Sequence, residues 1–275
     1  MDISDLAILS VPVSRVIDCL GKGISAVASP YVYKRLERAK MEIERERADQ
    51  NALITLEEAL AADLIKEART TRDKQEIANI SAIYSLAIQE LQMVNDLALP
   101  DKLVSTEWAS HFYDNAKYCS DEEVQMLWAK ILAGEIQEPG KYYKRTLANL
   151  KLIERHEAEW FTKICKYTME GAYFPRFVLE DETIPFNQYQ SLVDCGFLNA
   201  EEGNLEISKD EIIPLKSKRL DVKLVGKAFN MPVITLTDTG VQICELVDTD
   251  AEGEFVQKLV KMMNDSKMVD VSVIE

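Results

Sequence analysis

The segment SDEEVQMLWAKILAGEI, residues 120–136, constrains the possible folds of this chain more than any other. Ser120 and Glu123 stand three positions apart, the spacing of a reciprocal capping box, so the sequence predicts that a helix starts there. Apolar residues then recur at i, i+3, i+4, i+7 and i+8, on one helix face: Val124, Leu127, Trp128, Ile131 and Leu132. A tryptophan in the middle of this face needs partners that bury its ring, so the segment predicts the centre of a helical core.

Three further segments predict the helices that complete this core. STEWASHFYDNAKYC (105–119) precedes the central helix. After it, EPGKYYKRTLANLKLI (138–153) predicts a Pro139-Gly140 turn and a further helix, and RHEAEWFTKICKYTM (155–169) follows. The segments 105–119 and 155–169 contribute one tryptophan each, and large rings supply much of the buried area of a small helical bundle. The residues that we expect in the core are Trp108, Leu127, Trp128, Ile131, Leu132, Trp160 and Phe161.

Residues 1–100 predict a helical region of a different character. An apolar stripe runs from Leu6 to Val27, and residues 31–70 carry many charges of both signs, which is typical of an exposed helix. TRDKQEIANISAIYSLAIQELQ (71–92) predicts another amphipathic helix. We expect the apolar stripe to pack on the body of the protein or on a second subunit. Docking on a membrane surface is the alternative, which the few cations of the stripe disfavour.

The pattern changes after Gly171. PFNQYQSLVDCGFLNA (185–200) predicts a short helix that ends at Gly196, and β-type alternation follows between 199 and 234. A last helix then opens at Thr237 or Thr239. This order is that of a winged-helix module with an unusually long wing. We therefore predict a mostly α fold with an N-terminal helical region (1–100), a helical core (101–170) and a winged-helix-like α+β module (171–275).

Composition sets limits on the partners and on the compartment. The chain has 275 residues, 47% of them hydrophobic, and a net charge of −15 that opposes general attraction to nucleic acids and anionic membranes. Its five cysteines form no CxxC pair, so we expect reduced thiols. We see neither a basic signal-peptide start nor an apolar run long enough to cross a bilayer. The sequence thus predicts a cytoplasmic protein.

No motif in the sequence predicts catalysis, a cofactor or a bound metal. His111 and His156 are the two histidines, and neither has a second histidine at zinc-ligand spacing. There is no glycine-rich phosphate loop and no G-x-S-x-G motif. Asp221-Val222-Lys223 has the acid-x-Lys form of some metal-dependent nucleases, but a second copy, Asp265-Ser266-Lys267, shows how readily chance produces it. We predict a non-enzymatic protein, with a nuclease as a remote alternative.

One local cluster of positive charge stands out in this acidic chain. On a wing it would straddle a phosphate backbone, and on a protein surface it would dock an acidic partner. Its plainest explanation is a solvated hairpin, because Asp210, Glu211 and Asp221 lie close by in the sequence. The cluster comprises Lys216, Lys218, Arg219, Lys223 and Lys227.

Several blocks of the sequence resemble a bacterial family known only as a domain of unknown function. The resemblance rests on the LWAKILAGE run (127–135), Pro139-Gly140, Lys144-Arg145-Thr146, and Glu157-Ala158 with Phe161. Tyr143 departs from it, because a small hydroxyl residue is expected there. The same architecture is similar, more distantly, to the Abi-alpha family, whose name links it to abortive infection by phage.

The resemblance to the Abi-alpha family implies a place in anti-phage defence, and it supplies no catalytic residues to carry over to this chain. Together with the residues above, these resemblances lead us to predict a protein that interacts with a protein partner or forms a homo-oligomer, in a regulatory role. Nucleic-acid binding through the basic cluster is the alternative.

Overall fold

The computed structural model describes residue 19 and residues 71–93, 100–181 and 183–274. The chain divides into two compact units, Met1–Lys151 and Leu152–Glu275, which are described one at a time. The predicted N-terminal stripe and charged helices lie outside the described residues, except for Cys19, which is helical and buried. Within the described ranges, no helix is both long enough and apolar enough to cross a membrane.

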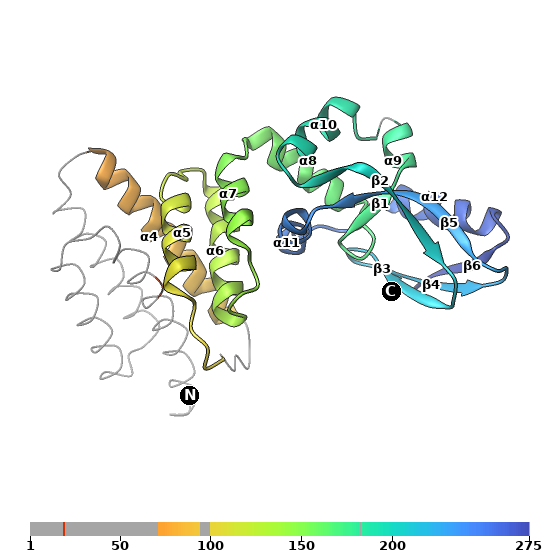
Figure 1. Cartoon of the computed structure of the whole chain (residues 1–275), viewed down its shortest axis with the longest axis horizontal. Coiled ribbons are helices and arrows are strands. Elements are labelled where there is room, and N and C mark those ends of the chain that lie inside the picture. The colour runs from red at the N-terminus through yellow and green to blue at the C-terminus, as the bar shows by residue number, and fades with distance from the viewer. Residues whose placement is uncertain (1–18, 20–70, 94–99, 182, 275) are drawn as a thin grey trace. The chain divides into compact units, whose positions relative to one another are not determined.

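The described part of the first unit is helical. It contains α4 (Thr71–Met93), α5 (Thr106–Ala116), α6 (Glu122–Gln137) and α7 (Lys144–Leu152). Helix α4 packs along α6 and contacts α5 (Figure 1). The ring of Phe112 joins these helices, because its centroid lies 6.1 Å from that of Tyr84, 5.2 Å from that of Trp108 and 5.4 Å from that of Trp128. All four rings are buried, so an aromatic cluster forms the centre of this unit.

Helix α6 begins one residue later than the capping box predicted. Asp121 is its N-cap: the carboxylate accepts hydrogen bonds from the backbone N–H of Glu123 at 3.0 Å and of Val124 at 3.2 Å. The predicted cap, Ser120, is exposed. A carboxylate at a helix N-terminus satisfies unpaired N–H groups and also opposes the positive end of the helix dipole, which a neutral hydroxyl does less well.

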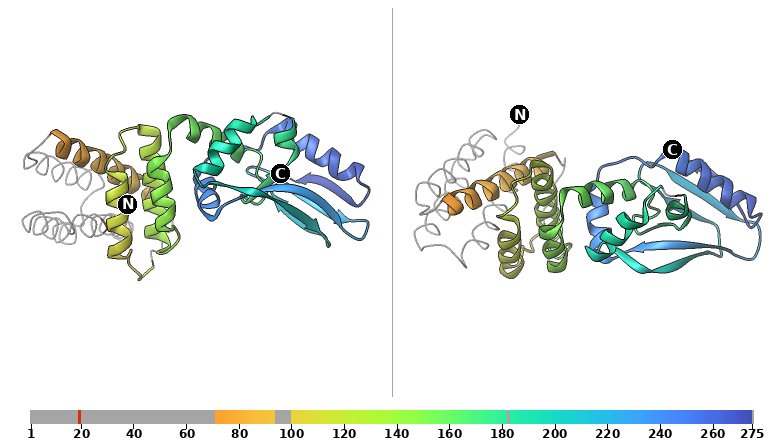
Figure 2. Two further views of the ribbon diagram at one scale, coloured as in Figure 1. Left: turned by 45° about the horizontal axis from the view of Figure 1, so that its top comes forward. Right: turned by 90° about the horizontal axis from the view of Figure 1, so that it is seen from above.

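The second unit mixes helices with strands. Its elements are α8 (Arg155–Cys165), β1 (Tyr173–Pro175), α9 (Phe177–Glu180), α10 (Phe186–Asp194), β2 (Leu198–Ile207), β3 (Glu211–Pro214), β4 (Arg219–Leu224), β5 (Phe229–Leu236), α11 (Asp238–Leu246), α12 (Gly253–Asp265) and β6 (Val269–Ile274). The strands form two antiparallel sheets, with orders β1-β5-β2 and β3-β4-β6. Helix α12 lies alongside β6, and β2 and β5 form the longest ribbon (Figure 2).

The prediction of a mostly α protein with a winged-helix-like C-terminal module is therefore wrong. Of the described residues, 53% are helical and 19% lie in strands, so the fold is a mixture of α and β. The segment interpreted as one long wing, 199–234, is divided between the two sheets. The second sheet is completed by β6, a strand that the sequence analysis did not predict. Alternation identifies strands, but it does not say which distant strand each one will pair with.

The start of α11 shows that some local predictions were correct. The hydroxyl of Thr237 caps this helix by accepting from the N–H of Gly240 at 3.1 Å, and it donates to the carbonyl of Gly196 at 2.6 Å. Gly196 follows α10 with a φ of 76°, as the predicted helix end requires. A Cβ on Gly240 would lie 2.1 Å from the carbonyl oxygen of Phe197, so this close approach requires glycine.

Strand β6 is an edge strand of the second sheet, and one side chain covers the middle of its outer edge. The amide of Asn264, in α12, accepts from the N–H of Val271 at 2.7 Å and donates to the carbonyl of Val271 at 3.1 Å. These are the two hydrogen bonds that a neighbouring strand would make with this residue.

The cap of α6 gives a first prediction. We expect Asp121→Ala to lower the free energy of unfolding by about 1 kcal/mol, because two N–H groups lose their acceptor. Ser120→Ala is the matched control and should change it by less than about 0.5 kcal/mol. Urea unfolding followed by circular dichroism measures both. A larger loss for Ser120→Ala would show that Ser120 is the cap.

Candidate functional site

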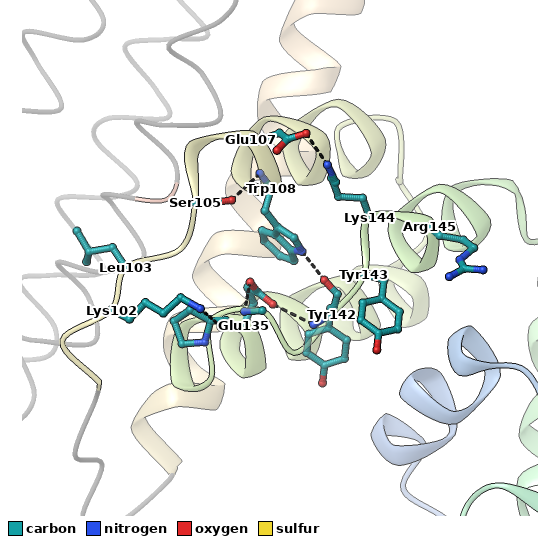
Figure 3. A pocket seen from close by; sticks show the side chains of 12 residues that line it. Lys102, Leu103, Ser105, Glu107, Trp108, Glu135, Tyr142, Tyr143, Lys144 and Arg145 are labelled. Atoms are coloured by element: carbon teal, nitrogen blue, oxygen red, sulfur yellow. Dashed lines mark hydrogen bonds and ion pairs between the residues drawn. The ribbon is translucent and has the colours of Figure 1, made fainter.

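The first unit contains a pocket of about 520 Å³ near the loop that joins α6 to α7 (Figure 3). Trp108, Glu135 and Tyr142 are the buried residues among its lining. Exposed side chains surround it, among them Leu103 and Tyr143, which are 45% and 47% exposed. The pocket thus combines a largely aromatic interior with an accessible rim.

The buried carboxylate of Glu135 holds the loop in place. Its Oε1 accepts from the N–H of Gly140 at 2.7 Å, and its Oε2 accepts from the N–H of Tyr142 at 3.0 Å. Burial raises the pKa of Glu135, while these hydrogen bonds and the charge of Lys102 oppose that rise. Gly140 has a φ of 102°, which favours glycine at the turn. One side chain therefore ties the end of α6 to the chain that leads into α7.

Two further contacts fix Tyr142. The indole N–H of Trp108 donates to the carbonyl of Tyr142 at 2.8 Å. The ring of Tyr142 packs against Gly134. A Cβ atom at position 134 would lie 2.8 Å from Cε2 of Tyr142, which is too close, so only glycine fits there. The Ala-Gly-Glu run before the Pro-Gly turn thus has a structural explanation: glycine admits the ring and glutamate binds the loop.

Cations dominate the rim of the pocket. Lys144 pairs with Glu107, and this hydrogen bond and charge lower the pKa of Glu107. Lys102 donates to the carbonyl of Pro139 at 2.9 Å. Arg145 is exposed and makes no ion pair within the part of the chain that the structure describes. Arg145 is therefore available to an anionic group of a ligand.

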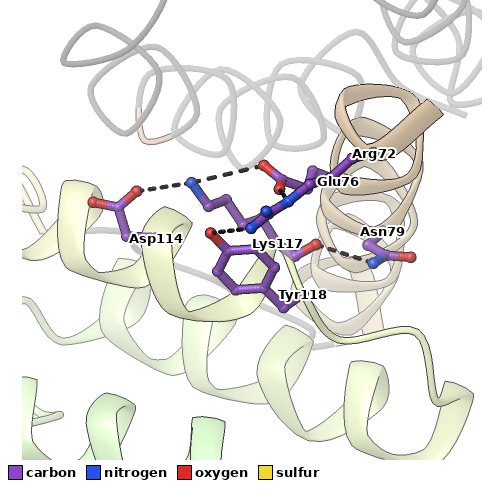
Figure 4. A network of polar contacts seen from close by, with 6 residues as sticks. All are labelled: Arg72, Glu76, Asn79, Asp114, Lys117 and Tyr118. Atoms are coloured by element: carbon purple, nitrogen blue, oxygen red, sulfur yellow. Dashed lines mark hydrogen bonds and ion pairs between the residues drawn. The ribbon is translucent and has the colours of Figure 1, made fainter. Parts of the chain in front are cut away.

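A second polar cluster in this unit surrounds Tyr118 (Figure 4). The cations of Arg72, Lys117 and Lys151 lie 5.5, 5.2 and 5.1 Å from its ring centroid. Arg72 pairs with Glu76 at 2.9 Å, and Lys117 pairs with Asp114 at 3.3 Å. Much of the positive charge is neutralised in place, so we interpret this network as a tie between α4 and the end of α5.

The residues predicted for the core lie on both sides of the boundary between the units. Those that are buried are Trp108, Trp128, Ile131, Leu132 and Phe161, whereas Leu127 and Trp160 are partly exposed. Phe161 and Trp160 belong to α8 of the second unit, where Trp160 contacts His156 with ring centroids 4.6 Å apart.

The residues of the predicted basic cluster have different partners. Lys216 donates to the carbonyls of Cys244 and Val247, at the end of α11. Lys223 lies 3.9 Å from Asp221 and opposite Asp270 on β6. Lys218, Arg219 and Lys227 make no ion pair among the described residues.

The hairpin turn that carries Lys216 is joined to the loop between α11 and α12 by one hydrogen bond. The N–H of Ala251 donates to the hydroxyl of Ser217 at 3.2 Å.

The acid-x-Lys fragment, Asp221 to Lys223, lies on β4. Among the described residues, no three histidine, cysteine, aspartate or glutamate side chains are grouped to hold a metal ion.

Comparison with known proteins finds one family. Residues 65–173 match the model of a family described as protein of unknown function (DUF2806), a match that covers less than half of the chain but includes the pocket. No curated protein and no solved structure matches the chain. The match supports the predicted resemblance to a family of unknown function, and the likeness to the Abi-alpha family stays a prediction.

Sequence reasoning did not find the pocket, although one signal was present. Glu135 stands four residues after Ile131 and seven after Trp128, so it falls on the apolar face of its own helix. A charged residue at such a position is seldom buried without partners. This pattern would have singled out Glu135 before its hydrogen bonds were seen.

We expect Glu135→Gln to lower the free energy of unfolding by about 1–3 kcal/mol, because the N–H of Gly140 or of Tyr142 would face an amide NH₂ instead of an acceptor. Glu138→Gln removes the same charge from an exposed residue of the same segment and should have little effect. Urea unfolding at neutral pH compares the two variants. Equal effects would contradict the role of Glu135.

Proposed function

We propose that this is a cytoplasmic, non-enzymatic interaction or regulatory protein that binds a partner through the pocket of its first unit. One observation carries the proposal: an aromatic-lined pocket of about 520 Å³ with Lys102, Lys144 and Arg145 on its rim, in a chain with a net charge of −15. Pockets with an apolar interior and a few placed polar groups are typical of binding sites. Tyrosine and arginine are enriched among residues that dominate binding energies.

The charges of the rim favour an acidic segment of a partner protein. Lys144 is paired with Glu107 and Lys102 with a backbone carbonyl, so Arg145 supplies the available charge. Its planar guanidinium can bind a carboxylate through two parallel hydrogen bonds. An aromatic or aliphatic side chain of the same segment would fill the pocket against Trp108.

Peptide selection on the full chain tests this proposal. Peptides enriched from a random library should be acidic and carry an apolar residue. They should bind Arg145→Glu about tenfold more weakly, which corresponds to ~1.4 kcal/mol. Lys74→Glu makes a similar charge change on the exposed face of α4, outside the pocket, and should bind as the wild type does. Selection of peptides that bind Arg145→Glu equally well would refute the pocket as the site.

We place this interaction in anti-phage defence, a role suggested by the distant resemblance of the architecture predicted from the sequence to the Abi-alpha family. Expression of the wild-type protein in a bacterial host should lower the plating efficiency of some phages in a panel. Arg145→Glu should abolish this protection and Lys74→Glu should keep it. A panel on which the wild type protects against no phage would remove the defence role and leave the peptide experiment to decide on binding.

Nucleic-acid binding by the basic cluster has less support. Lys216 donates to backbone carbonyls at the end of α11, and Lys223 lies 3.9 Å from Asp221, so two of the five cations already have partners. The net charge of the chain also repels phosphates. A metal-dependent nuclease has no supporting observation beyond the acid-x-Lys fragment.

A further inference from the structure

Strand β2 runs along β5 and forms one edge of the sheet β1-β5-β2 (Figure 1). The other edge strands of the two described sheets are shorter or covered. β1 has three residues and ends at Pro175, β3 has four and ends at Pro214, and the amide of Asn264 covers the middle of β6. Short strands and prolines prevent edge pairing, whereas β2 has ten residues and contains no proline.

The bonding of β5 shows which backbone groups of β2 point away from the sheet. Pro232 of β5 stands opposite Asn204 of β2. The carbonyl of Pro232 accepts from the N–H of Arg176, just beyond β1, at 3.0 Å, so Pro232 bonds toward β1 and not toward β2. Because the bonding direction alternates along an antiparallel strand, Asn204 and its alternate neighbours, Glu202 and Glu206, point their N–H and C=O groups outward.

These outward groups are open to a further strand. The hydroxyl of Tyr189 covers the start of β2, because it donates to the carbonyls of Asn199 at 3.1 Å and of Ala200 at 3.3 Å. Farther along, no hydrogen bond from the described residues reaches the outward backbone groups of residues 202–206, which we call the open edge. Backbone donors and acceptors in this arrangement are what an extended peptide uses when it adds to a sheet.

Acidic side chains line the exposed face of the open edge. Glu202, Asn204 and Glu206 are all exposed, and the ten residues of β2 include three glutamates and no cation. Arg176 binds Glu202 at 2.9 Å, whereas Glu206 makes no ion pair within the described ranges. Charge therefore favours an occupant that carries cations. The net charge of −15 also attracts a basic segment over longer distances.

A second copy of this chain is a poor occupant of the open edge. If two β2 strands paired antiparallel about Asn204, Glu202 of each copy would stand opposite Glu206 of the other. Like charges directly opposite each other in a sheet are destabilising. Each copy also carries a net charge of −15, so the two chains repel each other as they approach.

The other face of β2 determines the rest of the pattern. Gly203 and Leu205 are half-buried there and stand opposite Val233 and Met231 of β5, which are buried. An added strand would extend this partly apolar face and meet the glutamates on the opposite one. Since side chains alternate between the faces of a strand, the matching segment reads basic, apolar, polar, apolar, basic.

We propose that the open edge binds an extended basic segment of a partner protein, which joins the sheet as a fourth strand. The added strand runs antiparallel to β2, and its backbone bonds to the outward groups of residues 202–206. Lysines or arginines four positions apart stand opposite Glu202 and Glu206, and the residue midway between them stands opposite Asn204. This site and the pocket belong to different units and take segments of opposite charge, so each proposal is tested separately.

A labelled synthetic peptide, Ser-Gly-Lys-Val-Thr-Val-Lys-Gly-Ser, tests the proposal on the full chain by fluorescence anisotropy. The peptide should bind, and the same peptide with glutamates in place of both lysines should not. N-methylation of the threonine removes the N–H that bonds to Asn204 and should abolish binding. N-methylation of either valine changes an N–H that faces solvent and should leave the affinity unchanged. An electrostatic contact alone would not distinguish these two methylated peptides.

Variants of the chain test the same site from the other side. Glu206→Lys should weaken binding of the parent peptide about tenfold, because an attractive cross-strand pair becomes repulsive. Glu254→Lys makes the same charge change on an exposed residue of α12 and should bind as the wild type does. Asn204→Pro removes an outward N–H without removing a bond to β5, so it should abolish binding and leave the circular dichroism spectrum unchanged.

The methylated peptides are used with the wild-type chain, so the test does not depend on the folding of any variant. The proposal is overturned if the parent peptide does not bind, or if both methylated forms bind equally well. Equal weakening by Glu206→Lys and Glu254→Lys would also overturn it, because the binding would then follow net charge alone. A dimer in sedimentation that Asn204→Pro dissociates would show that the occupant is a second copy and not a basic segment.

Discussion

The helical unit depends on one buried carboxylate bonded to backbone N–H groups. Glu135 binds the N–H groups of Gly140 and Tyr142 and so fixes the path from α6 to α7. A buried charge costs free energy unless hydrogen bonds compensate it, so this carboxylate and the loop must form together. The pocket inherits its shape from this arrangement, since the loop that Glu135 holds supplies Tyr142 to the interior and carries the chain on to Tyr143, Lys144 and Arg145.

In the second unit a positively charged side chain, rather than a negatively charged one, binds backbone groups. Lys216 donates to carbonyls at the end of α11, where the helix dipole is negative. Glu135 of the first unit accepts from N–H groups, and Lys216 of the second donates to C=O groups. In each case a long side chain satisfies backbone groups that regular secondary structure leaves open. Glu135 also lines the pocket of its unit.

The sequence predicted the helix faces and helix ends that depend on residues close together in the chain. It did not predict the strand pairing that depends on residues far apart in the chain. The apolar face of α6 repeats every three to four residues, and Thr237 and Gly196 mark helix ends by their own chemistry. The choice between Ser120 and Asp121 as the cap depends on a carboxylate that can accept two N–H groups, which spacing alone does not decide. The pairing of β4 with β6 arises from contacts between distant segments that carry no local signal.

Strand β6 carries valines at alternate positions and contains neither lysine nor proline, which often protect the edge of a sheet. Asn264 compensates, because its amide occupies the hydrogen-bonding groups of Val271 that another strand would seek. Without this amide, the folded molecule would expose the hydrogen-bonding groups of β6, which could then pair with a strand of another molecule. A substitution that removes the Asn264 amide would therefore lower the solubility of the protein more than it would disturb the fold of a single molecule.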